Sequence, residues 1–285
     1  MTGLWERFGS SLTTSNDHED PPGSVRVMVE FRHELGVVAE ADAFWDGGRD
    51  WRVRFSPSLE VHWTWRSRCA QDDALNALAS EFECAANASA NLLYRHGAPR
   101  VAKCGSQFEH ADGTPFFWLC DTAWNGPLKA DRPPWTRYLA DRAAKGFSAV
   151  QFVATPWLGA VCDAQGRRPY NGSAQLRIAP VYFRRLDCYA DALNASGMIA
   201  GPVLAWAAAW CQGVLDLNSG TSLSDATLIL LARYIVSRYG AHHTPWILAG
   251  DADSRSEPAE RRRRIGRAVF DHGYRLVTMH PGGKI

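Results

Sequence analysis

The chain has 285 residues, of which 46% are hydrophobic and 21% charged, and its formal net charge is +1. This composition is typical of a globular protein with one large domain or two ordinary ones. The small net charge excludes a global electrostatic bias towards nucleic acid or an anionic membrane. Twelve tryptophans are many for this length, and tryptophan serves both as a core residue and as a flat binding surface.

The first 23 residues contain neither the basic nor the apolar segment of a secretory signal, which predicts a cytoplasmic protein. The longest apolar run, residues 198–211, is too short for a membrane span and contains Gly and Pro. The seven cysteines are widely spaced and form no C-x-x-C pair. We therefore expect neither a disulfide framework nor a metal site, and no cofactor.

Apolar residues occupy every second position in three segments between Ser24 and Gly105. This alternation predicts strands with one face in a core and the other in water. The sequence WDGG at 45–48 separates two of these strands and predicts a hairpin turn. We therefore predict an antiparallel β-sandwich over residues 1–105. The alternating apolar residues are Val25, Val27, Val29 and Phe31, then Trp51, Val53 and Phe55, then Leu59, Val61, Trp63 and Trp65.

After Asp112 short continuous apolar runs alternate with helical patterns. Such runs predict strands buried on both faces, and the alternation predicts a parallel β/α domain over residues 106–285. The predicted strands are Phe116–Cys120, Ala149–Ala154, Met198–Trp206, Trp246–Ala249 and Leu276–Met279. The predicted helices run from Trp135 to Gly146, from Pro180 to Gly197, from a cap at Ser224 or Asp225 to Gly240, and from Ser256 to Gly273.

A doubly wound sheet and a (β/α)8 barrel of the TIM type begin with the same pattern. No Gly-rich phosphate loop follows the first predicted strand, which argues against a dinucleotide-binding sheet. Polar and aromatic residues instead follow almost every strand, where a barrel places its active site. In strand order they are Asp121 and Trp124, then Trp157, then Trp206 and Trp210, then Asp251 and Asp253, and last His280.

Carboxylates and tryptophans around a barrel mouth suit a sugar ligand. The apolar C–H faces of a sugar ring stack on indole, and its hydroxyls hydrogen-bond to carboxylates and amides. Glycosidic cleavage needs a carboxylic acid to protonate the leaving oxygen and a second carboxylate as nucleophile or base. Acidic mouths also serve other chemistries, so this pattern alone leaves the reaction open.

Four segments carry a resemblance to a known family: ADGTPFFWLCDTAW, YLADRAAKGFSAVQF, RYIVSRYGAHHTPWILAGDAD and LVTMHPGG. They resemble the apiosidase-like family of glycoside hydrolases. The segment FWDGGRDWRVRFSP, followed by WTW, resembles the β-sandwich domain that often precedes that catalytic barrel. The resemblance implies a (β/α)8 hydrolase that acts on sugar side chains of plant-type polysaccharides by retaining chemistry between two carboxylates.

The resemblance also implies roles for individual residues. The family's GGD-like segment after the fourth strand matches Gly250-Asp251, with Ala249 in place of a glycine. Asp251 is therefore the predicted general acid/base, with Asp253 as the fallback and a capping role in the next loop as the alternative. The residues predicted to bind sugar are Asp121, Trp124, Gln151, Trp157, Trp206 and His280. For Gln151 and His280 a packing role is the alternative.

The chain departs from the family at its C-terminal end. The family's second carboxylate, a glutamate, lies on a strand later than the five predicted here, and a complete barrel takes roughly 250 residues. We therefore expect a C-terminally truncated chain that holds the first five β/α units and has no turnover on its own. The alternative is a non-catalytic carbohydrate-binding protein or an inactive remnant.

Three smaller signals predict structure rather than chemistry. The run RRRRIGR at 261–267 is expected to form the solvated outer face of the fourth helix, with Ile265, Ala268 and Val269 facing inward. Cys120 is expected to be a core thiol. The pair at 242–243, two histidines, precedes the fourth strand at the bottom of the barrel, where loops stabilise the fold. The expected partner is a carbohydrate, with neither nucleic acid nor membrane.

Overall fold

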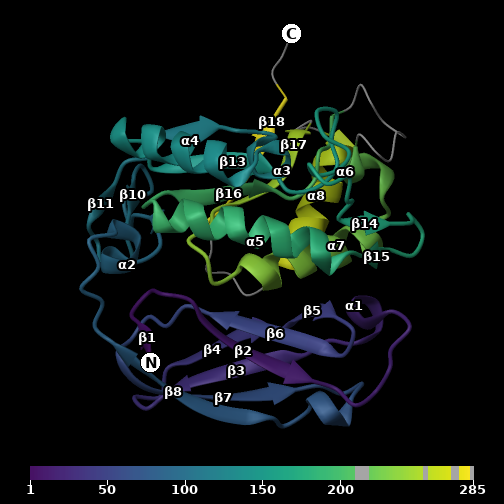
Figure 1. Cartoon of the computed structure of the whole chain (residues 1–285), viewed down its shortest axis with the longest axis horizontal. Coiled ribbons are helices and arrows are strands. Elements are labelled where there is room, and N and C mark those ends of the chain that lie inside the picture. The colour runs from purple at the N-terminus through teal and green to yellow at the C-terminus, as the bar shows by residue number, and fades with distance from the viewer. Residues whose placement is uncertain (209–217, 253–255, 271–275, 283–285) are drawn as a thin grey trace.

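The computed structural model describes residues 1–208, 218–252, 256–270 and 276–282. A sheet-rich N-terminal region lies against a layer of helices, and a curled parallel sheet lies beyond those helices (Figure 1). We call residues 1–85 the N-terminal region and residues 120–282 the β/α region. The chain is therefore a mixed α/β structure with its antiparallel sheets concentrated in the first part.

Two sheets make up the N-terminal region. The first has the order β1-β8-β7-β3-β4, and all its pairs are antiparallel except β1 with β8. The second has the order β2-β6-β5. The elements are β1 (Thr2–Gly3), β2 (Phe8–Thr13), α1 (Pro21–Ser24), β3 (Met28–His33), β4 (Val38–Asp42), β5 (Phe44–Gly47), β6 (Asp50–Phe55), β7 (Val61–Arg68), η1 (Asp73–Leu75) and β8 (Ala79–Ala85).

The alternating residues of these strands form one core between the two sheets. Val29, Phe31 and Trp63 from the first sheet and Val53 from the second are each 0% exposed and belong to the same cluster. The predicted period of two is confirmed here, and so is the hairpin turn, which joins β5 to β6. Val61 is an exception: it opens β7 with φ +73° and is 47% exposed.

The segment between the two regions corrects one prediction. It contains α2 (Leu92–His96) and a small sheet of β9 (Arg100–Val101), β10 (Phe108–Glu109) and β11 (Pro115–Phe116). The run Phe116–Cys120 was predicted to be one buried strand, and this is wrong. Phe116 pairs with Phe108 in the small sheet, and Phe117 is 77% exposed. The run is divided between two sheets, so the first strand of the β/α region is only β12 (Cys120–Thr122).

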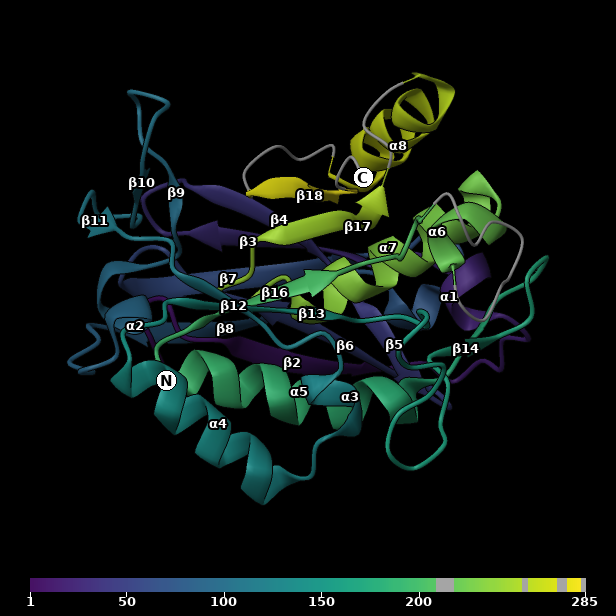
Figure 2. The same ribbon diagram turned by 90° about the horizontal axis from the view of Figure 1, so that it is seen from above.

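The β/α region is built on a parallel sheet with the order β12-β13-β16-β17-β18. Because each strand pairs with the next along the chain, the sheet curls in one direction and forms a half-barrel (Figure 2). The last four strands lie where the apolar runs predicted them. They are β13 (Ala149–Val153), β16 (Ile199–Val203), β17 (Trp246–Ala252) and β18 (Val277–Pro281).

Helices cover the convex face of this sheet. Val150, Phe152 and Trp246 point towards them and share a core with Leu193 and Ile235. The predicted helices are confirmed, although Gly273, the predicted end of the fourth, lies outside the described residues. The third is capped by Ser224, whose Oγ accepts a hydrogen bond from the Thr227 backbone at 3.2 Å. The elements are α3 (Gly126–Lys129), α4 (Arg132–Ala144), β14 (Tyr170–Asn171), β15 (Arg177–Ile178), α5 (Pro180–Ala195), α6 (Ser219–Ser222), α7 (Asp225–Tyr239) and α8 (Ser256–Val269).

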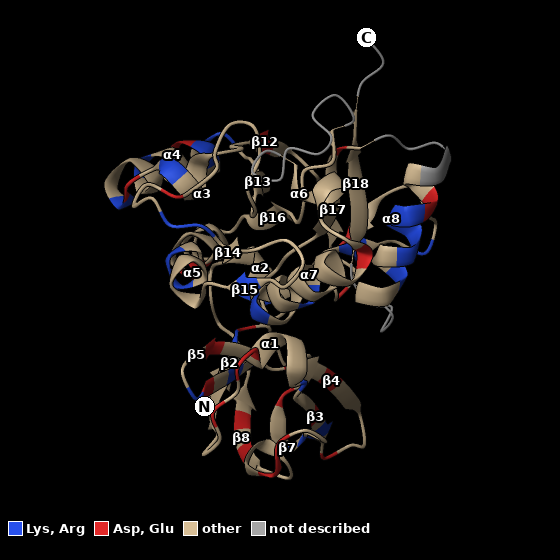
Figure 3. Ribbon diagram, turned by 90° about the vertical axis from the view of Figure 1, so that its right-hand side faces the viewer, with Lys and Arg blue, Asp and Glu red and all other residues tan. Residues whose placement is uncertain are grey.

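The arginine run lies on α8, at the side of the molecule (Figure 3). Ile265 and Val269 are buried at 1% and 8% exposure, as predicted, and Ala268 is partly buried. Arg262 was expected on the solvated face, and this is wrong, because it is buried at 8% exposure. Arg261 and Arg264 both pair with Asp225 at the start of α7. No helix in the described part of the chain is long and apolar enough to cross a membrane.

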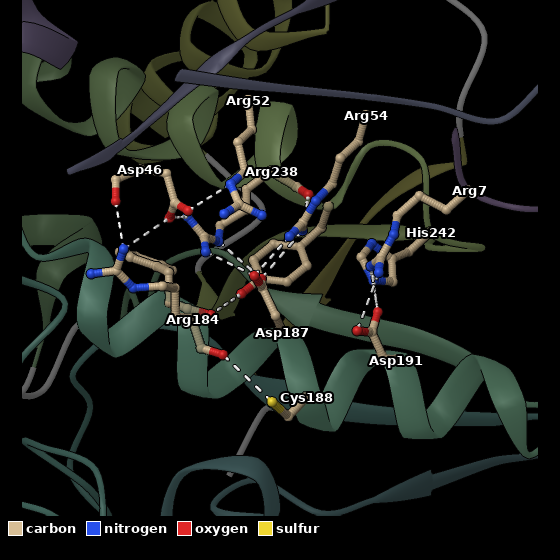
Figure 4. A network of polar contacts seen from close by, with 12 residues as sticks. Arg7, Asp46, Arg52, Arg54, Arg184, Asp187, Cys188, Asp191, Arg238 and His242 are labelled. Carbon is tan, nitrogen blue, oxygen red and sulfur yellow. Dashed lines mark hydrogen bonds and ion pairs between the residues drawn. The ribbon is translucent and has the colours of Figure 1, made fainter. Parts of the chain in front are cut away.

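Two polar clusters join the N-terminal region to α5 and α7 (Figure 4). In the first, Asp187 accepts hydrogen bonds from Arg238 at 2.7 and 2.9 Å and from Arg54 at 2.7 and 3.3 Å. Arg238 also donates to Asp46 at 2.9 Å. In the second, Asp191 contacts both Arg7 and His242. Burial lowers the pKa of His242 although Asp191 raises it, which favours the neutral imidazole.

Candidate active site

Three tryptophans meet beyond the carboxyl ends of neighbouring strands. The ring centres of Trp124 and Trp206 lie 5.5 Å apart, those of Trp124 and Trp157 6.1 Å, and those of Trp157 and Trp206 4.7 Å. His280 on β18 joins them, with its ring centre 5.2 Å from that of Trp124 and 6.5 Å from that of Trp206. The structure thus brings together four predicted site residues that are far apart in the sequence.

Asp251 lies beside this cluster, near the end of β17. Its Oδ1 is 3.7 Å from Nε2 of His280, and 37% of its side chain is exposed. The backbone of Asp251 has φ +48°, in the left-handed region that few residues other than glycine adopt. The pairing of β17 with β18 also shifts register on both sides of Gly250. Bulges of this kind re-aim side chains and are frequent beside active sites.

Gly250 allows the tryptophan cluster to approach the strand. A Cβ atom at this position would lie 2.5 Å from Cζ3 of Trp206, which is too close for any side chain. The Nε1 atom of Trp206 is buried and has no hydrogen-bond partner in the described part of the chain. Ala249, which replaces the family's first glycine, is buried at 3% exposure against Ala207 and Ala252.

Asn125 is a site residue that the sequence analysis missed. Trp157 donates a hydrogen bond from its Nε1 to Oδ1 of Asn125 at 2.7 Å, and Asn125 donates from Nδ2 to the Gly159 carbonyl at 3.2 Å. These contacts fix the orientation of the Trp157 indole. The signal in the sequence was its position directly after Trp124, beyond the end of β12.

Gln151 lies on the concave face of the half-barrel, below the tryptophans. It donates a hydrogen bond from Nε2 to Oγ1 of Thr122 at 2.7 Å, across the β12–β13 pair. Val153 is further along the same face and packs with Trp206 and Ile247. Gln151 and Thr122 therefore supply an amide and a hydroxyl to the space that the concave face encloses, and Thr122 too was missed from the sequence.

Asp121 faces the other way, towards the helices. It pairs in the sheet with Val150, whose side chain is in the convex core. Tyr138 on α4 donates a hydrogen bond to Oδ2 of Asp121 at 2.9 Å, and Arg142 lies 3.3 Å from the same oxygen. Burial and this hydrogen bond raise the pKa of Tyr138. Because side chains alternate along a strand, the structure brings Asp121 to α4 and not to the tryptophans.

Cys120, possible metal ligands and Asp253 were the other candidates for a catalytic or metal-binding role. Burial raises the pKa of the Cys120 thiol to about 11, so it is protonated at neutral pH and is a poor nucleophile. Among the described residues no group of three His, Cys, Asp or Glu side chains could hold a metal ion. Asp253, the fallback acid, lies outside the described residues, as do Trp210 and Cys211.

The site lies within a stretch that matches a family model. Residues 103–285 match the model described as "Apiosidase-like, catalytic domain", and residues 1–70 match a "Domain of unknown function (DUF5060)". No curated protein sequence matches the chain.

Solved structures with the same fold are glycoside hydrolases by name. A Bacteroides vulgatus protein assigned to the glycoside hydrolases has a TM-score of 0.78 at 18% identity, over 98% of this chain and 56% of that one. A family 5 glycoside hydrolase of the same organism has a TM-score of 0.53 at 20% identity, over 67% of this chain and 41% of that one. This chain thus spans about half the length of the structures it matches. Its fold is glycoside hydrolase-like, and the chain belongs to the apiosidase-like family.

Proposed function

We propose that this chain carries the acid/base half of a glycoside hydrolase that removes sugar side chains from plant-type polysaccharides by a retaining, two-carboxylate mechanism. One observation carries the proposal. The carboxylate of Asp251 is held by a bulged, left-handed backbone next to His280 and beside three clustered tryptophans. This arrangement offers an acid at one side of a surface on which a sugar ring could stack.

In this mechanism Asp251 protonates the glycosidic oxygen as the leaving group departs, and then removes a proton from the attacking water. The partly exposed indoles of Trp124 and Trp157 contact the apolar faces of the sugar, whereas Trp206, at 3% exposure, supports them from behind. His280 orients Asp251 and hydrogen-bonds to the sugar, and Gln151 reaches a hydroxyl from the concave face. Asp121 has a structural role in this proposal, because its carboxylate is engaged by α4.

We also propose a division of the chain into two domains. Residues 1–105 would be a β-sandwich domain and residues 106–285 the first five β/α units of a (β/α)8 barrel. The shared core of the two N-terminal sheets and the curl of the parallel sheet support this division. The nucleophile is proposed to be a glutamate on a later strand of the barrel, as in the family.

A second candidate is carbohydrate binding without turnover. Among the described residues, Asp251 is the carboxylate that contacts the tryptophan and histidine cluster, whereas glycosidic cleavage needs two. This second candidate predicts that the chain binds sugar at this site without hydrolysing it.

The test compares Asp251→Asn with the parent protein in a form that contains both carboxylates. Loss of the acid should reduce turnover on an unactivated glycoside by about 10²–10⁴-fold, the usual contribution of such a group. On a dinitrophenyl glycoside the leaving group needs no protonation. The rate of glycosidic bond cleavage on this substrate should therefore fall much less. Equal loss on both substrates, or no loss on either, would remove Asp251 from the acid/base role.

A further inference from the structure

A cavity lies between the N-terminal region and the β/α region, separate from the tryptophan cluster. Its volume is about 480 Å³, within the range of small-molecule sites. One wall comes from α1 and β5, and the other from α7 and the β14–β15 hairpin, which approach each other at one end of the molecule (Figure 1). We call this cavity the inter-region cleft.

The lining of the cleft combines aromatic rings with neutral polar groups. Trp45 is partly exposed there, and Phe44 and Tyr234 are buried beside it. Two amides, Gln71 and Gln175, reach the cleft from opposite regions. Hydroxyl groups line it as well, those of Ser24, Thr227 and Ser237. The partly exposed ring of Trp45 can stack on a sugar, and the amides and hydroxyls can hydrogen-bond to it.

The charges in the cleft favour a neutral sugar over an acidic one. Arg26 pairs with Asp42, with Nε 3.1 Å from Oδ1. Arg233 donates hydrogen bonds to the carbonyl of Ala268, at 2.8 and 3.2 Å. Asp20 lines the cleft too and adds a negative charge. The two arginines and two aspartates of the lining sum to zero net charge, so an anionic sugar finds no net attraction there.

One buried group in the cleft has an unused hydrogen-bonding capacity. Trp51 is 2% exposed and lines the cleft, and its Nε1 has no hydrogen-bond partner within the described residues. A buried N–H without an acceptor destabilises the folded state. Because this atom is buried, a ligand hydroxyl can accept the hydrogen bond only if the wall of the cleft moves locally.

The cleft is connected to the candidate active site through the chain. The segment between β13 and α5 supplies Trp157 to the tryptophan cluster, and further along it supplies Ala174, Gln175 and Leu176 to the cleft. Thr227, in the first turn of α7, also lines the cleft, at the helix end that follows the carboxyl end of β16. The cleft thus shares one chain segment with the candidate active site, and it extends along α7 as far as Ser237.

We propose that the inter-region cleft binds neutral sugar residues of an oligosaccharide, as a binding site distinct from the one at Asp251. The ligand class rests on the proposed function. A bound sugar would contact Trp45 and Gln71 on one wall and Gln175 and α7 on the other. Since such a ligand bridges the two regions, its binding also stabilises their contact.

The test uses isothermal titration calorimetry in a Trp124→Ala background, in which the candidate active site is disabled. The probes are neutral hexasaccharides of glucose, xylose, arabinose and galactose, and a trigalacturonate as the anionic probe. We expect at least one neutral hexasaccharide to bind, and the trigalacturonate to bind at least tenfold more weakly. The melting temperature should rise with the concentration of the neutral ligand.

Two variants locate the binding. Ala226→Trp places a large side chain into the cleft from an exposed position on α7 and should weaken binding at least tenfold. Ala143→Trp on α4 is the matched control, because Ala143 is exposed and is not part of the cleft lining, and it should leave the affinity unchanged. Gln175→Ala, at an exposed hairpin position, should weaken binding with little effect on folding.

The outcomes separate this proposal from the proposed function. Absence of binding by every neutral hexasaccharide, or equal affinities for Ala226→Trp and Ala143→Trp, overturns the cleft proposal. Preferential binding of the trigalacturonate overturns it as well. If Ala226→Trp abolishes binding while Asp251→Asn leaves hydrolysis unchanged, the cleft proposal is supported. The assignment of Asp251 as the acid/base is then refuted.

Discussion

Arg238 on α7 and Asp187 on α5 form a bidentate ion pair in which the guanidinium is completely buried, with Nε–Oδ1 and Nη2–Oδ2 distances of 2.9 and 2.7 Å. Arg54 from β6 binds the same carboxylate from the N-terminal region. A single carboxylate therefore binds guanidinium groups from both regions. Its removal would take this carboxylate from Arg54 and leave Arg238 with Asp46.

We predict that Asp187→Ala lowers the free energy of unfolding by about 3–5 kcal/mol, because it deprives these arginines of a shared carboxylate. Urea denaturation followed by circular dichroism measures this. The control is Arg263→Ala, which removes an exposed ion pair with Glu260 on α8 and should change the free energy by less than about 0.5 kcal/mol. Similar losses for the two variants would contradict the role of Asp187.

The same cluster predicts a dependence of stability on pH. Burial alone would raise the pKa of Asp187, but the hydrogen bonds and charges of Arg238 and Arg54 outweigh it and hold this pKa well below its usual value. The folded state therefore binds the proton less tightly than the unfolded state, whose pKa is about 3.9. The stabilisation is complete above that value and is lost as the pH falls towards the folded pKa. Unfolding measured between pH 6 and pH 2 should show a shallower decline for Asp187→Asn than for the parent chain.

Gly250→Ala should disrupt the tryptophan cluster, because the added Cβ would lie 2.5 Å from Cζ3 of Trp206. Overpacking of this kind costs about 1–3 kcal/mol. The near-ultraviolet circular dichroism of the coupled indoles should change at the same time. Gly9→Ala on β2 is the control, since its Cβ would lie 3.8 Å from the Val53 carbonyl, an ordinary contact, and its spectrum should match that of the parent.

Asn125→Ala should weaken sugar binding at the tryptophan cluster by about 5–10-fold, which corresponds to about 1–1.4 kcal/mol for one lost hydrogen bond. The reason is that Trp157 loses the acceptor that fixes its ring. Asn125→Asp keeps an acceptor oxygen and should retain most of the affinity. Titration calorimetry in an Ala226→Trp background, which blocks the inter-region cleft, measures both variants. Equal affinities for the two would show that the orientation of Trp157 does not matter.

The variant Asp121→Asn tests whether Asp121 stabilises the fold or binds sugar. We expect a loss of about 1 kcal/mol in the free energy of unfolding, since the charge-assisted contacts with Tyr138 and Arg142 are weakened at a partly exposed site. Sugar affinity in the same calorimetric assay should stay within twofold of the parent value. A large loss of affinity with unchanged stability would return Asp121 to the sugar site.

The sequence correctly predicted those parts of the fold in which a regular local pattern of apolar or capping residues is present. The alternation from Val25 to Phe31 and the cap at Ser224 are examples, and both depend on local patterns that tertiary contacts reinforce. The run Phe116–Cys120 shows where such reasoning fails. Its residues are apolar throughout, so nothing local shows that Phe116 pairs with β10 while Cys120 joins another sheet.

The candidate site was predictable to a similar degree. The carboxyl ends of the strands could be located, and four aromatic residues placed there do meet. The side on which a residue lies was not predictable for Asp121, because a strand of three residues has too short a pattern to define its faces. The bulge that aims Asp251 depends on the pairing of β17 with β18 and has no local signature.

The ion-pair cluster has a consequence for how the protein is made. Arg54 and Asp187 are 133 residues apart, and Asp46 and Arg238 are 192 apart. On the ribosome the N-terminal region emerges and can fold long before α7 has been synthesised. During that interval Asp46 already pairs with Arg52 inside the N-terminal region, whereas Arg54 has to wait for Asp187 on α5. The buried cluster is complete only when Arg238 has been made, which predicts that docking of the two regions is a late step of folding.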